Sequence, residues 1–406
     1  MSKAKVEQDL DLRKGIESRL EMIKLLIPLG LQAIKEMLEE EVDNLAGEKY
    51  QRDESELRRW GSNLGSAYLG GQKVSFPVPR VRNIKNKQEI PLESYKALQN
   101  QTAIDDSVLA KVINGIATRK YEKVVEQVPE AFGLKKSTVS KKFIRASAKN
   151  LKKVLEKKLD NEDIVAIFMD GKTFSSNELI IALGVNMRGD KIVLGLIESA
   201  SENSSVISDF LEELIERGLK IDDEILFILD GSKGLYSGVK KVFGEKAHIQ
   251  RCQWHKRENV VSYLPKGQQM RMRRKLQNAY NTPSYSEAKR SLDGIKKELK
   301  LMNVSSAKSL EEGLEETLTL QRLGLFEELG RSFKTTNCIE NLNRQIEQYT
   351  GRVCRWKTSD QRQRWVASAI VEIEPRLRKI KGHHHLKTLR ERMKTNQPIV
   401  KERLAA

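Results

Sequence analysis

Apolar residues recur three or four positions apart through the first part of the chain, which is the spacing of one face of an α-helix. The stripe comprises Ile16, Leu20, Ile23, Ile27, Leu31, Ile34, Leu38, Val42 and Leu45. Pro28 lies inside it and should kink or split the helix, because proline has no amide hydrogen to donate. We therefore predict a helical region over residues 1–60. Its apolar face packs either within the chain or against a second copy, as a dimerisation helix.

Residues 61–155 combine a strand pattern with a helical one. Residues 68–82 alternate apolar and polar positions and contain prolines, which is typical of a short hairpin with edge character. From about residue 104 the pattern is helical and predicts a helix-turn-helix. Its supporting helix is Tyr121–Phe132, its turn covers 133–136, and its recognition helix is Ser137–Arg145.

The predicted recognition helix has one apolar and one basic face. Ser137 is a good N-cap, and Val139, Phe143 and Ala146 form an inward stripe. The outward positions, which would contact DNA, are Lys135, Lys136, Thr138, Lys141, Lys142 and Arg145. The alternative is a basic surface helix that follows a glycine turn and does not recognise bases.

From residue 163 the pattern changes to short apolar runs typical of strands. We predict strands at Asp163–Asp170, Leu179–Met187, Lys191–Ile197, Ile225–Leu229 and His248–Gln250, and helices at Asn203–Gly218, Gly234–Phe243 and Trp254–Leu264. This order predicts an α/β fold, a ribonuclease H-like core with a mixed sheet, of which residues 156–265 form the first part. In that core the first and fourth strands lie side by side.

The rest of the chain predicts three further regions. Residues 266–330 have helical patterns and should form an all-helical insertion, and residues 331–375 should return to the core. The insertion begins with basic residues, of which Arg271, Arg273 and Arg274 are expected to contact DNA. Residues 376–406 form a basic tail that is either solvated or in contact with phosphates.

Composition narrows the class of partner. The formal net charge is +17 with a pI near 9.5, which favours a polyanion without separating DNA from RNA or an anionic membrane surface. Three cysteines argue against a disulfide scaffold. No stretch approaches the roughly 18–20 apolar residues of a membrane span, and the N-terminus lacks the apolar segment of a signal peptide. We therefore expect a cytoplasmic protein that does not span a membrane.

Three acidic residues carry the candidate chemistry. Asp170 and Asp230 each end an apolar run and precede a glycine, and Glu340 lies in the first turns of a predicted helix. Each has an ordinary explanation alone, since Asp-Gly is a common turn and helix glutamates are usually solvated. Together they predict a site for Mg²⁺ or Mn²⁺, with two ions clamping a phosphodiester. Lys172 and Lys233 follow the aspartates closely enough to contact substrate phosphates.

Four motifs resemble those of the bacterial Mutator-like transposases of insertion sequences, which belong to the DDE class. They are Asp170-Gly-Lys-Thr-Phe174, Leu229-Asp-Gly-Ser-Lys-Gly-Leu235, Gln250-Arg-Cys-Gln-Trp-His-Lys-Arg-Glu-Asn-Val260 and Thr335-Thr-Asn-Cys-Ile-Glu-Asn-Leu-Asn-Arg344. The resemblance covers roughly residues 60–375. It implies that Asp170, Asp230 and Glu340 are the catalytic acids, and that Cys252 and His255 match the family's Cys-x-x-His signature. Many members have a different residue where this chain has Gly171.

The resemblance implies a bacterial, nucleoid-associated transposase with no membrane partner, which binds the inverted ends of its element in double-stranded DNA. Mg²⁺-dependent cleavage and transfer of the resulting 3′-hydroxyls to target DNA would follow. A DNA-binding regulator derived from a transposase, and a nuclease without strand transfer, are the alternatives. Because two ends must be handled together, a homodimer or a larger synaptic complex is expected.

Cys252 and His255 suggest zinc, but two ligands are only half of a tetrahedral site. The sequence shows no second Cys/His pair close by, and His248 is the other candidate before Cys338. We therefore expect no zinc and assign the pair to packing and positioning near the acids. Trp254, which lies between them, is expected to be buried in the core rather than free to stack on a base.

Overall fold

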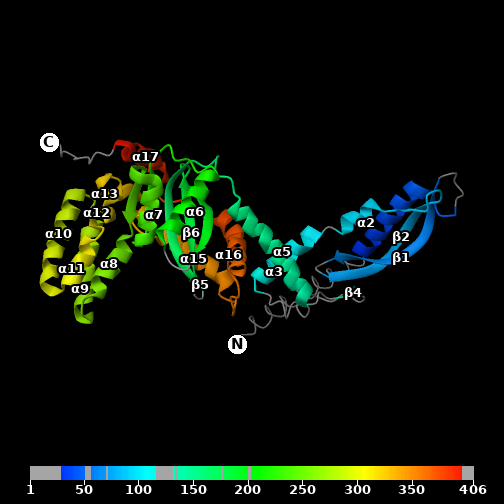
Figure 1. The fold of residues 1–406 in the computed structure, drawn as a ribbon, viewed down its shortest axis with the longest axis horizontal. Coiled ribbons are helices and arrows are strands. Elements are labelled where there is room, and N and C mark those ends of the chain that lie inside the picture. Colours follow the sequence, from blue (N-terminus) through cyan, green and yellow to red (C-terminus); the bar gives the residue numbers. More distant parts are fainter. Residues whose placement is uncertain are drawn as a thin grey trace, which may run out of the picture. The chain divides into compact units, whose positions relative to one another are not determined.

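The computed structural model describes residues 29–50, 56–69, 72–99, 101–115, 131–132, 136–174, 177–199 and 203–395. The chain divides into two compact units, Met1–Ala146 and Ser147–Ala406, which are described separately below (Figure 1). Among the described residues, no helix combines the length and the apolar character needed to cross a membrane.

The first unit is built on a long antiparallel hairpin of β1 (Leu57–Leu69) and β2 (Gln72–Asn83). A helix over residues 29–46 covers the hairpin through Ile34, Leu38 and Val42, which pack with buried residues of β2. This part of the predicted apolar stripe thus packs within the chain, while Pro28 and the earlier positions lie outside the described residues. Because β1 begins at Leu57, the predicted helical boundary at residue 60 is wrong, and the hairpin is longer than predicted.

Short elements complete this unit. The strands β3 (Glu89–Ile90) and β4 (Ala131–Phe132) both pair with β2, and the helices α2 (Glu93–Leu98) and α3 (Gln101–Ile113) follow β3. The position of β4 corrects the predicted supporting helix, because Phe132 pairs with Lys73 in a sheet instead of ending a helix. Residues 121–130 and 133–135, which include Lys135, lie outside the described residues.

The predicted recognition helix is part of the longer α5 (Lys136–Leu155), which already includes the residue before the predicted N-cap, Ser137. Val139, Phe143 and Ala146 are buried as predicted. Lys142, which was predicted to face outward, is buried instead. Its Nζ lies 3.5 Å from Oδ1 of Asp105, a buried residue of α3, and so it is paired inside the unit.

The second unit is organised around a five-stranded sheet with the order β7-β6-β5-β8-β9. The strands are β5 (Ile164–Phe174), β6 (Asn177–Asn186), β7 (Lys191–Ser199), β8 (Ile225–Leu229) and β9 (Ala247–Arg251). β5, β6 and β7 form an antiparallel meander, whereas β8 and β9 are parallel to β5. This is a mixed α/β fold, as predicted, and the first and fourth strands of the sheet are neighbours.

Helices cover both faces of this sheet. Along β5, Ile167 and Met169 pack towards α6 (Ser204–Glu216) and α7 (Lys233–Phe243), while Phe168 packs in the core of the opposite face. Buried residues of α14 (Phe326–Phe333), α15 (Asn337–Thr350), α16 (Ser359–Ile373) and α17 (Leu386–Thr395) form that second core. Leu386, Leu389 and Met393 of α17 are buried there, so the predicted solvated tail is, up to residue 395, part of the unit.

The segment between β9 and α14 is helical and has its own core. It comprises α8 (Gln253–Ser262), α9 (Lys266–Asn281), α10 (Tyr285–Met302), α11 (Val304–Glu311), α12 (Leu314–Thr317) and α13 (Thr319–Arg322). Leu276, Tyr280 and Leu292 lie in this core. The chain then returns to the sheet, where the Thr319 hydroxyl donates to the Ile249 carbonyl of β9 at 2.6 Å.

Candidate active site

Asp170 and Asp230 follow a pair of residues that are in register on two parallel strands. These are Met169 of β5 and Leu229, the last residue of β8. Asp170 is the next residue of β5, Asp230 is the first residue after β8, and adjacent strands lie about 4.8 Å apart. Asp170 does not end its strand as predicted, because β5 continues to Phe174 and Asp170 pairs with Ile181 of β6.

Glu340 lies in the first turn of α15. The helix is fastened to β5 by Asn343, whose Nδ2 donates to Oδ2 of Asp170 at 2.9 Å. Nζ of Lys172 donates to the Asn343 carbonyl at 3.0 Å and to Oε2 of Glu347 at 2.9 Å. Lys172 is therefore engaged in linking β5 to α15, rather than free for a phosphate as predicted.

The three carboxylates influence one another electrostatically. Burial raises the pKa of Asp170 to about 6, and the negative charges of Asp230 and Glu340 act in the same direction. His255 and the hydrogen bond from Asn343 oppose this rise. Within the described residues, neither Asp170 nor Asp230 forms an ion pair with a lysine or an arginine. The arrangement therefore concentrates negative charge, which His255 opposes.

A fourth acid, Glu178 of β6, lies beside this group and was not identified from the sequence. A Cβ on Gly171 would meet Oε1 of Glu178 at 2.1 Å, so the carboxyl group lies over the glycine. Burial raises the pKa of Glu178, and the charge of Asp230 adds to the effect. The absence of a side chain at residue 171 thus makes room for another acid next to Asp170.

The turn after Asp230 begins α7. Oδ1 of Asp230 accepts a hydrogen bond from the Ser232 amide at 2.9 Å, and Ser232 in turn caps α7. Lys233 is exposed, with its Nζ 3.8 Å from Oε1 of Glu312. It lines a cavity of about 310 Å³ together with Arg251, Tyr236 and Glu312. Of the two predicted phosphate contacts in the acid motifs, Lys233 is the one whose side chain is open to solvent.

The Cys252–His255 segment follows β9 and joins the chain segments that carry two of the acids. The Cys252 amide donates to the Leu229 carbonyl, immediately before Asp230, at 2.8 Å. The Gln253 amide donates to the Lys334 carbonyl, just before α15, at 3.0 Å. Trp254 is 47% exposed and meets the His255 ring edge to face, so the expected burial of this tryptophan is wrong.

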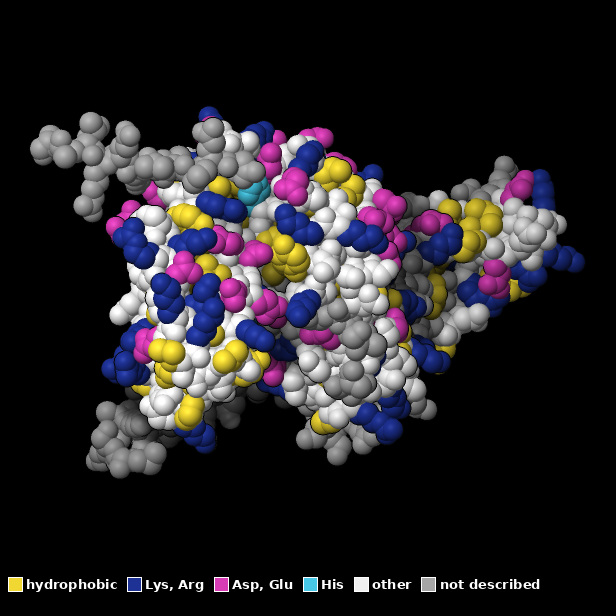
Figure 2. Space-filling model, turned by 60° about the vertical axis from the view of Figure 1, so that its left-hand side comes forward, with side chains coloured by type: hydrophobic (Ala, Val, Ile, Leu, Met, Phe, Trp, Pro, Cys, Tyr) yellow, Lys and Arg dark blue, Asp and Glu magenta, His cyan; other side chains and the backbone are white. Residues whose placement is uncertain are grey.

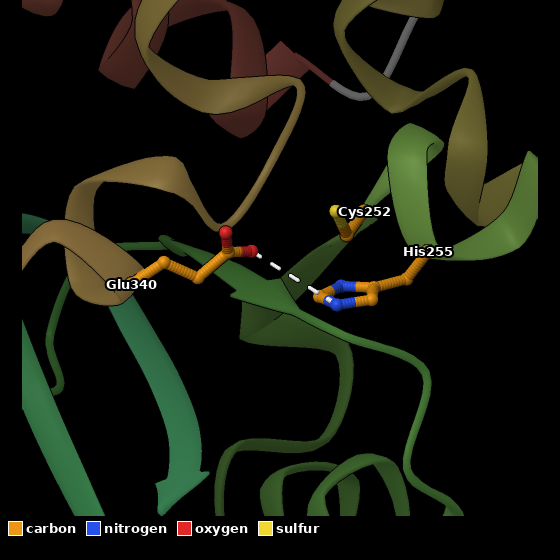
Figure 3. Close-up of side chains that lie close together, drawn as sticks. All are labelled: Cys252, His255 and Glu340. Carbon is orange, nitrogen blue, oxygen red and sulfur yellow. Dashed lines mark ion pairs between the residues drawn. The ribbon is translucent and has the colours of Figure 1, made fainter. Parts of the chain in front are cut away.

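Side chains continue this connection to Glu340. Oγ1 of Thr336 lies 2.5 Å from Oε1 of Glu340, 3.3 Å from Nδ1 of His255 and 3.4 Å from Sγ of Cys252. Nε2 of His255 is 4.0 Å from Oε1 of Glu340 (Figure 3). The hydrogen bond with Cys252 raises the pKa of His255 to about 9, against the effect of burial. Burial alone would raise the pKa of the Cys252 thiol, but hydrogen bonds with His255 and Thr336 lower it overall.

Two overlapping sets of side chains could hold a metal ion. Asp170, Asp230 and Glu340 offer oxygen ligands, which suit hard cations such as Mg²⁺. Cys252, His255 and Glu340 have ligand atoms that all lie within 4.8 Å of one another, so the fold adds a third ligand to the pair seen in the sequence. Because Glu340 belongs to both sets, its orientation determines which set is complete.

The remaining predicted DNA contacts lie on two helices. On α9, Arg274 is exposed, whereas Nη2 of Arg271 pairs with Glu298 at 3.3 Å and Nε of Arg273 pairs with Glu258 at 2.9 Å. The surface in Figure 2 accordingly carries Lys and Arg side chains interspersed with Asp and Glu.

The second helix is α5. Lys141 is exposed and Thr138 is partly buried. Arg145 is about half exposed, and its Nη2 donates to Asp105 at 3.1 Å. Lys136 belongs to this helix, but its side chain lies outside the described residues. The basic positions open to a ligand are therefore fewer than predicted.

Sequence reasoning missed Asn343 and the role of Thr336. Asn343 follows Glu340 by three residues, and residues at this spacing share a face of a helix. Helical spacing alone could therefore have placed Asn343 beside the acids. The contact of Thr336 with Cys252 joins residues 84 positions apart, and no local pattern announces it.

Comparison with known proteins finds that the chain is similar to the members of one family. The family model described as "Transposase, Mutator family" matches residues 4–374. The chain is 26% identical over 327 residues to the transposase for insertion sequence element IS256 in transposon Tn4001 from Staphylococcus aureus, covering 76% of this chain and 80% of that protein. It is 25% identical over 397 residues to the transposase for insertion sequence element ISRM5 from Rhizobium meliloti, covering 94% and 97%.

Proposed function

The chain belongs to the Mutator family of transposases, and from this premise we propose a DDE transposase that cleaves and joins DNA at Asp170, Asp230 and Glu340. The observation that carries the proposal is the pairing of β5 with β8, which sets Asp170 beside Asp230, together with the Asn343–Asp170 hydrogen bond, which holds the helix that carries Glu340 against β5. The relatives named above are transposases of insertion sequences. The substrate would be the inverted ends of the element that encodes the chain.

The strand order β7-β6-β5-β8-β9 supports assigning the core to the ribonuclease H-like class. In this arrangement β5 and β8 are adjacent and parallel, and the residues that follow the pair Met169 and Leu229 are Asp170 and Asp230. The helical segment 253–322 separates the second acid from the third in sequence, and α15 brings the third one back.

The donor set fits divalent cations. The charges of Asp230 and Glu340 add to the effect of burial in raising the pKa of Asp170. A positive charge placed among these carboxylates would stabilise the ionised form of Asp170, and Mg²⁺ or Mn²⁺ accepts such oxygen ligands. Asp170, Asp230 and Glu340 would hold the ions, with Glu178 close by. Bound ions would supply the charge that activates the attacking oxygen and stabilises the leaving one in an in-line displacement.

The protein's own contribution is to hold the acids in place before DNA arrives. Asn343 orients Asp170, the Ser232 amide orients Asp230, and Thr336 orients Glu340. Such preorganised groups lower the barrier because they need no rearrangement during the reaction. Lys233 and the exposed positions of α9 and α5 would contact phosphates and so position the ends. Because two ends react together, the working form would be a dimer or a larger synaptic complex.

Matched substitutions test this function. We expect D170N and E340Q to reduce Mg²⁺-dependent cleavage by about a thousandfold or more, because each removes a charge on which the chemistry depends. The exposed controls D209N and E327Q should retain wild-type activity. The substrate is DNA that carries the gene with its flanking sequence, supplied with a second, target plasmid. Binding of the flanking DNA by D170N should stay within about twofold.

Three outcomes separate the alternatives. Cleavage that persists in D170N would refute the assignment of the acids. Binding of flanking DNA by the wild-type chain without cleavage would favour a regulator derived from a transposase. Cleavage without joining of pre-cut 3′ ends to the target plasmid would favour a nuclease. Sedimentation of the chain on paired-end DNA tests the assembly, and a monomer there would contradict the proposed synaptic complex.

A further inference from the structure

We propose that Thr336 is a positioning residue that fixes the Glu340 carboxylate for metal binding, and that Cys252 and His255 hold the Thr336 hydroxyl in place. The inference rests on the proposed function and assigns a role to the Cys-x-x-His signature. Figure 3 shows Cys252, His255 and Glu340 converging, and the Thr336 hydroxyl is within hydrogen-bonding distance of all three.

Thr336 is used in an unusual way for its position. It is the N-cap residue of α15, where a threonine oxygen ordinarily accepts a hydrogen bond from the first turn of the helix. Here the Thr336 side chain makes no such capping bond, and its hydroxyl is turned to the Glu340 carboxylate one turn along the helix. The side chain is fully buried, so this orientation is held by its neighbours rather than by solvent.

The number of hydrogen bonds that a hydroxyl can donate and accept indicates where the hydrogen of the Thr336 hydroxyl lies. A hydroxyl has one hydrogen to donate and two lone pairs that accept. The 2.5 Å separation from Oε1 of Glu340 is typical of a hydroxyl donating to an ionised carboxylate, so we place the hydrogen there. The Thr336 oxygen is then an acceptor for Nδ1 of His255 at 3.3 Å. Sγ of Cys252, 3.4 Å away, is the alternative acceptor for the hydrogen of the Thr336 hydroxyl and lies on the same side of it as His255. In this assignment His255 carries a hydrogen on Nδ1.

The backbone anchors the network to both acid-bearing segments. Cys252 is bonded through its amide to Leu229, and Gln253 to Lys334, at 2.8 Å and 3.0 Å respectively. The segment therefore spans from the residue before Asp230 to the chain that enters α15. The hydrogen bond from the Thr336 hydroxyl then orients the Glu340 carboxylate relative to this segment. Partners of this kind, which orient a metal ligand without touching the metal, commonly change metal affinity by about 10–100-fold when removed.

Two substitutions separate the hydroxyl from the shape of the side chain. T336V keeps the branched shape and removes the hydroxyl, whereas T336S keeps the hydroxyl and removes a methyl group. We expect Mn²⁺ binding to the full-length chain, measured by electron paramagnetic resonance, to weaken about 10–100-fold in T336V and to stay within about twofold in T336S. In cleavage of flanking DNA, T336V should need correspondingly more Mg²⁺ than the wild-type chain for half-maximal activity. The DNA affinity and the melting temperature of T336S should match those of the wild-type chain.

Several results would overturn the inference. Mn²⁺ affinity of T336V equal to wild type would show that the hydroxyl does not position Glu340. Equal losses in T336S and T336V would assign Thr336 to packing. Zinc at one ion per purified chain, lost in C252S, would show that Cys252, His255 and Glu340 are ligands instead. If the wild-type chain binds no Mn²⁺, Glu340 is not a metal ligand, and the inference about Thr336 is wrong as well.

The proposed function fails separately from this inference. If the wild-type chain binds Mn²⁺ but does not cleave flanking DNA, the transposase assignment is wrong, and the Mn²⁺ affinities of T336V and T336S still decide the role of Thr336. If the wild-type chain cleaves DNA and T336V behaves identically to it, only the positioning role is wrong.

Discussion

Two aspartates, one in each unit, face opposite surroundings. Asp105 of the first unit is buried on α3 and meets Lys142 and Arg145 of α5. Asp170 of the second unit is partly buried on β5 and meets two further acids, with a histidine and an amide as the opposing groups. A buried carboxylate that is neutralised by its own chain has a structural explanation. One that is set against other carboxylates requires a cation from outside.

Asp105 and Asp170 should therefore have opposite effects on the stability of the fold. Breaking a buried ion pair leaves an uncompensated charge and is strongly destabilising. Gathering like charges destabilises the fold until a ligand arrives, which is a common property of functional sites. We therefore expect substitutions at Asp105 to affect folding, and substitutions at Asp170 to affect chemistry.

The largest effect should come from removing the acid of the neutralised site. D105L removes the buried carboxylate that pairs with Lys142 and should lower the free energy of unfolding of the first unit by about 3–5 kcal/mol. Urea denaturation followed by circular dichroism measures the change. The double variant D105L/K142M replaces the pair by apolar side chains and should recover most of the loss. A single D105L variant with wild-type stability would show that the pair is not structural.

A third buried charge, that of Lys256, differs from both aspartates. It has no closely paired carboxylate, and it does not belong to a candidate metal site. Lys256 of α8 is fully buried, and among the described residues its Nζ has no hydrogen-bond acceptor. Oε2 of Glu312 lies 4.0 Å away. Burial, with the charge of Arg251 adding to it, lowers the pKa of Lys256 to about 8. The ammonium form is thus less stable in the folded chain than in the unfolded one.

The sign of the pH dependence follows. The cost of burying the Lys256 ammonium is present in full below pH 8. It is lost as pH rises towards the unfolded pKa of about 10.4, because the folded chain gives up its proton first. K256M should therefore stabilise the second unit by up to ~3 kcal/mol at pH 7, and the gain should shrink between pH 8 and pH 10.4. Denaturation at pH 7, 9 and 10.4 checks this, and a gain that does not change with pH would contradict it.

The sequence predicts the second unit better than the first for a physical reason. Continuous apolar runs such as Ile225–Leu229 mark strands buried on both faces, and the order of the elements then places Asp170 beside Asp230. The burial of Lys142 depends instead on Asp105, 37 positions away, and helical periodicity cannot anticipate that pairing. The strand at Phe132 likewise depends on its pairing with Lys73.

The site itself was predictable in part. The three acids and the Cys-x-x-His pair could be listed from motifs and from the ends of apolar runs. The fourth acid Glu178 and the hydroxyl of Thr336 could not, because their positions depend on the register of β6 against β5 and on contacts between distant segments. Motifs indicate which residues take part, and packing determines which of them touch.

The central claim is that Asp170, Asp230 and Glu340 bind divalent cations together. Anomalous diffraction from crystals soaked in MnCl₂ tests it most directly, because manganese can be located independently of any activity. We predict one or two peaks among the three carboxylates, at roughly 2.0–2.3 Å from their oxygens, and none in crystals of D170N. A wild-type crystal without a peak there, or with its peak between Cys252 and His255, would contradict the account.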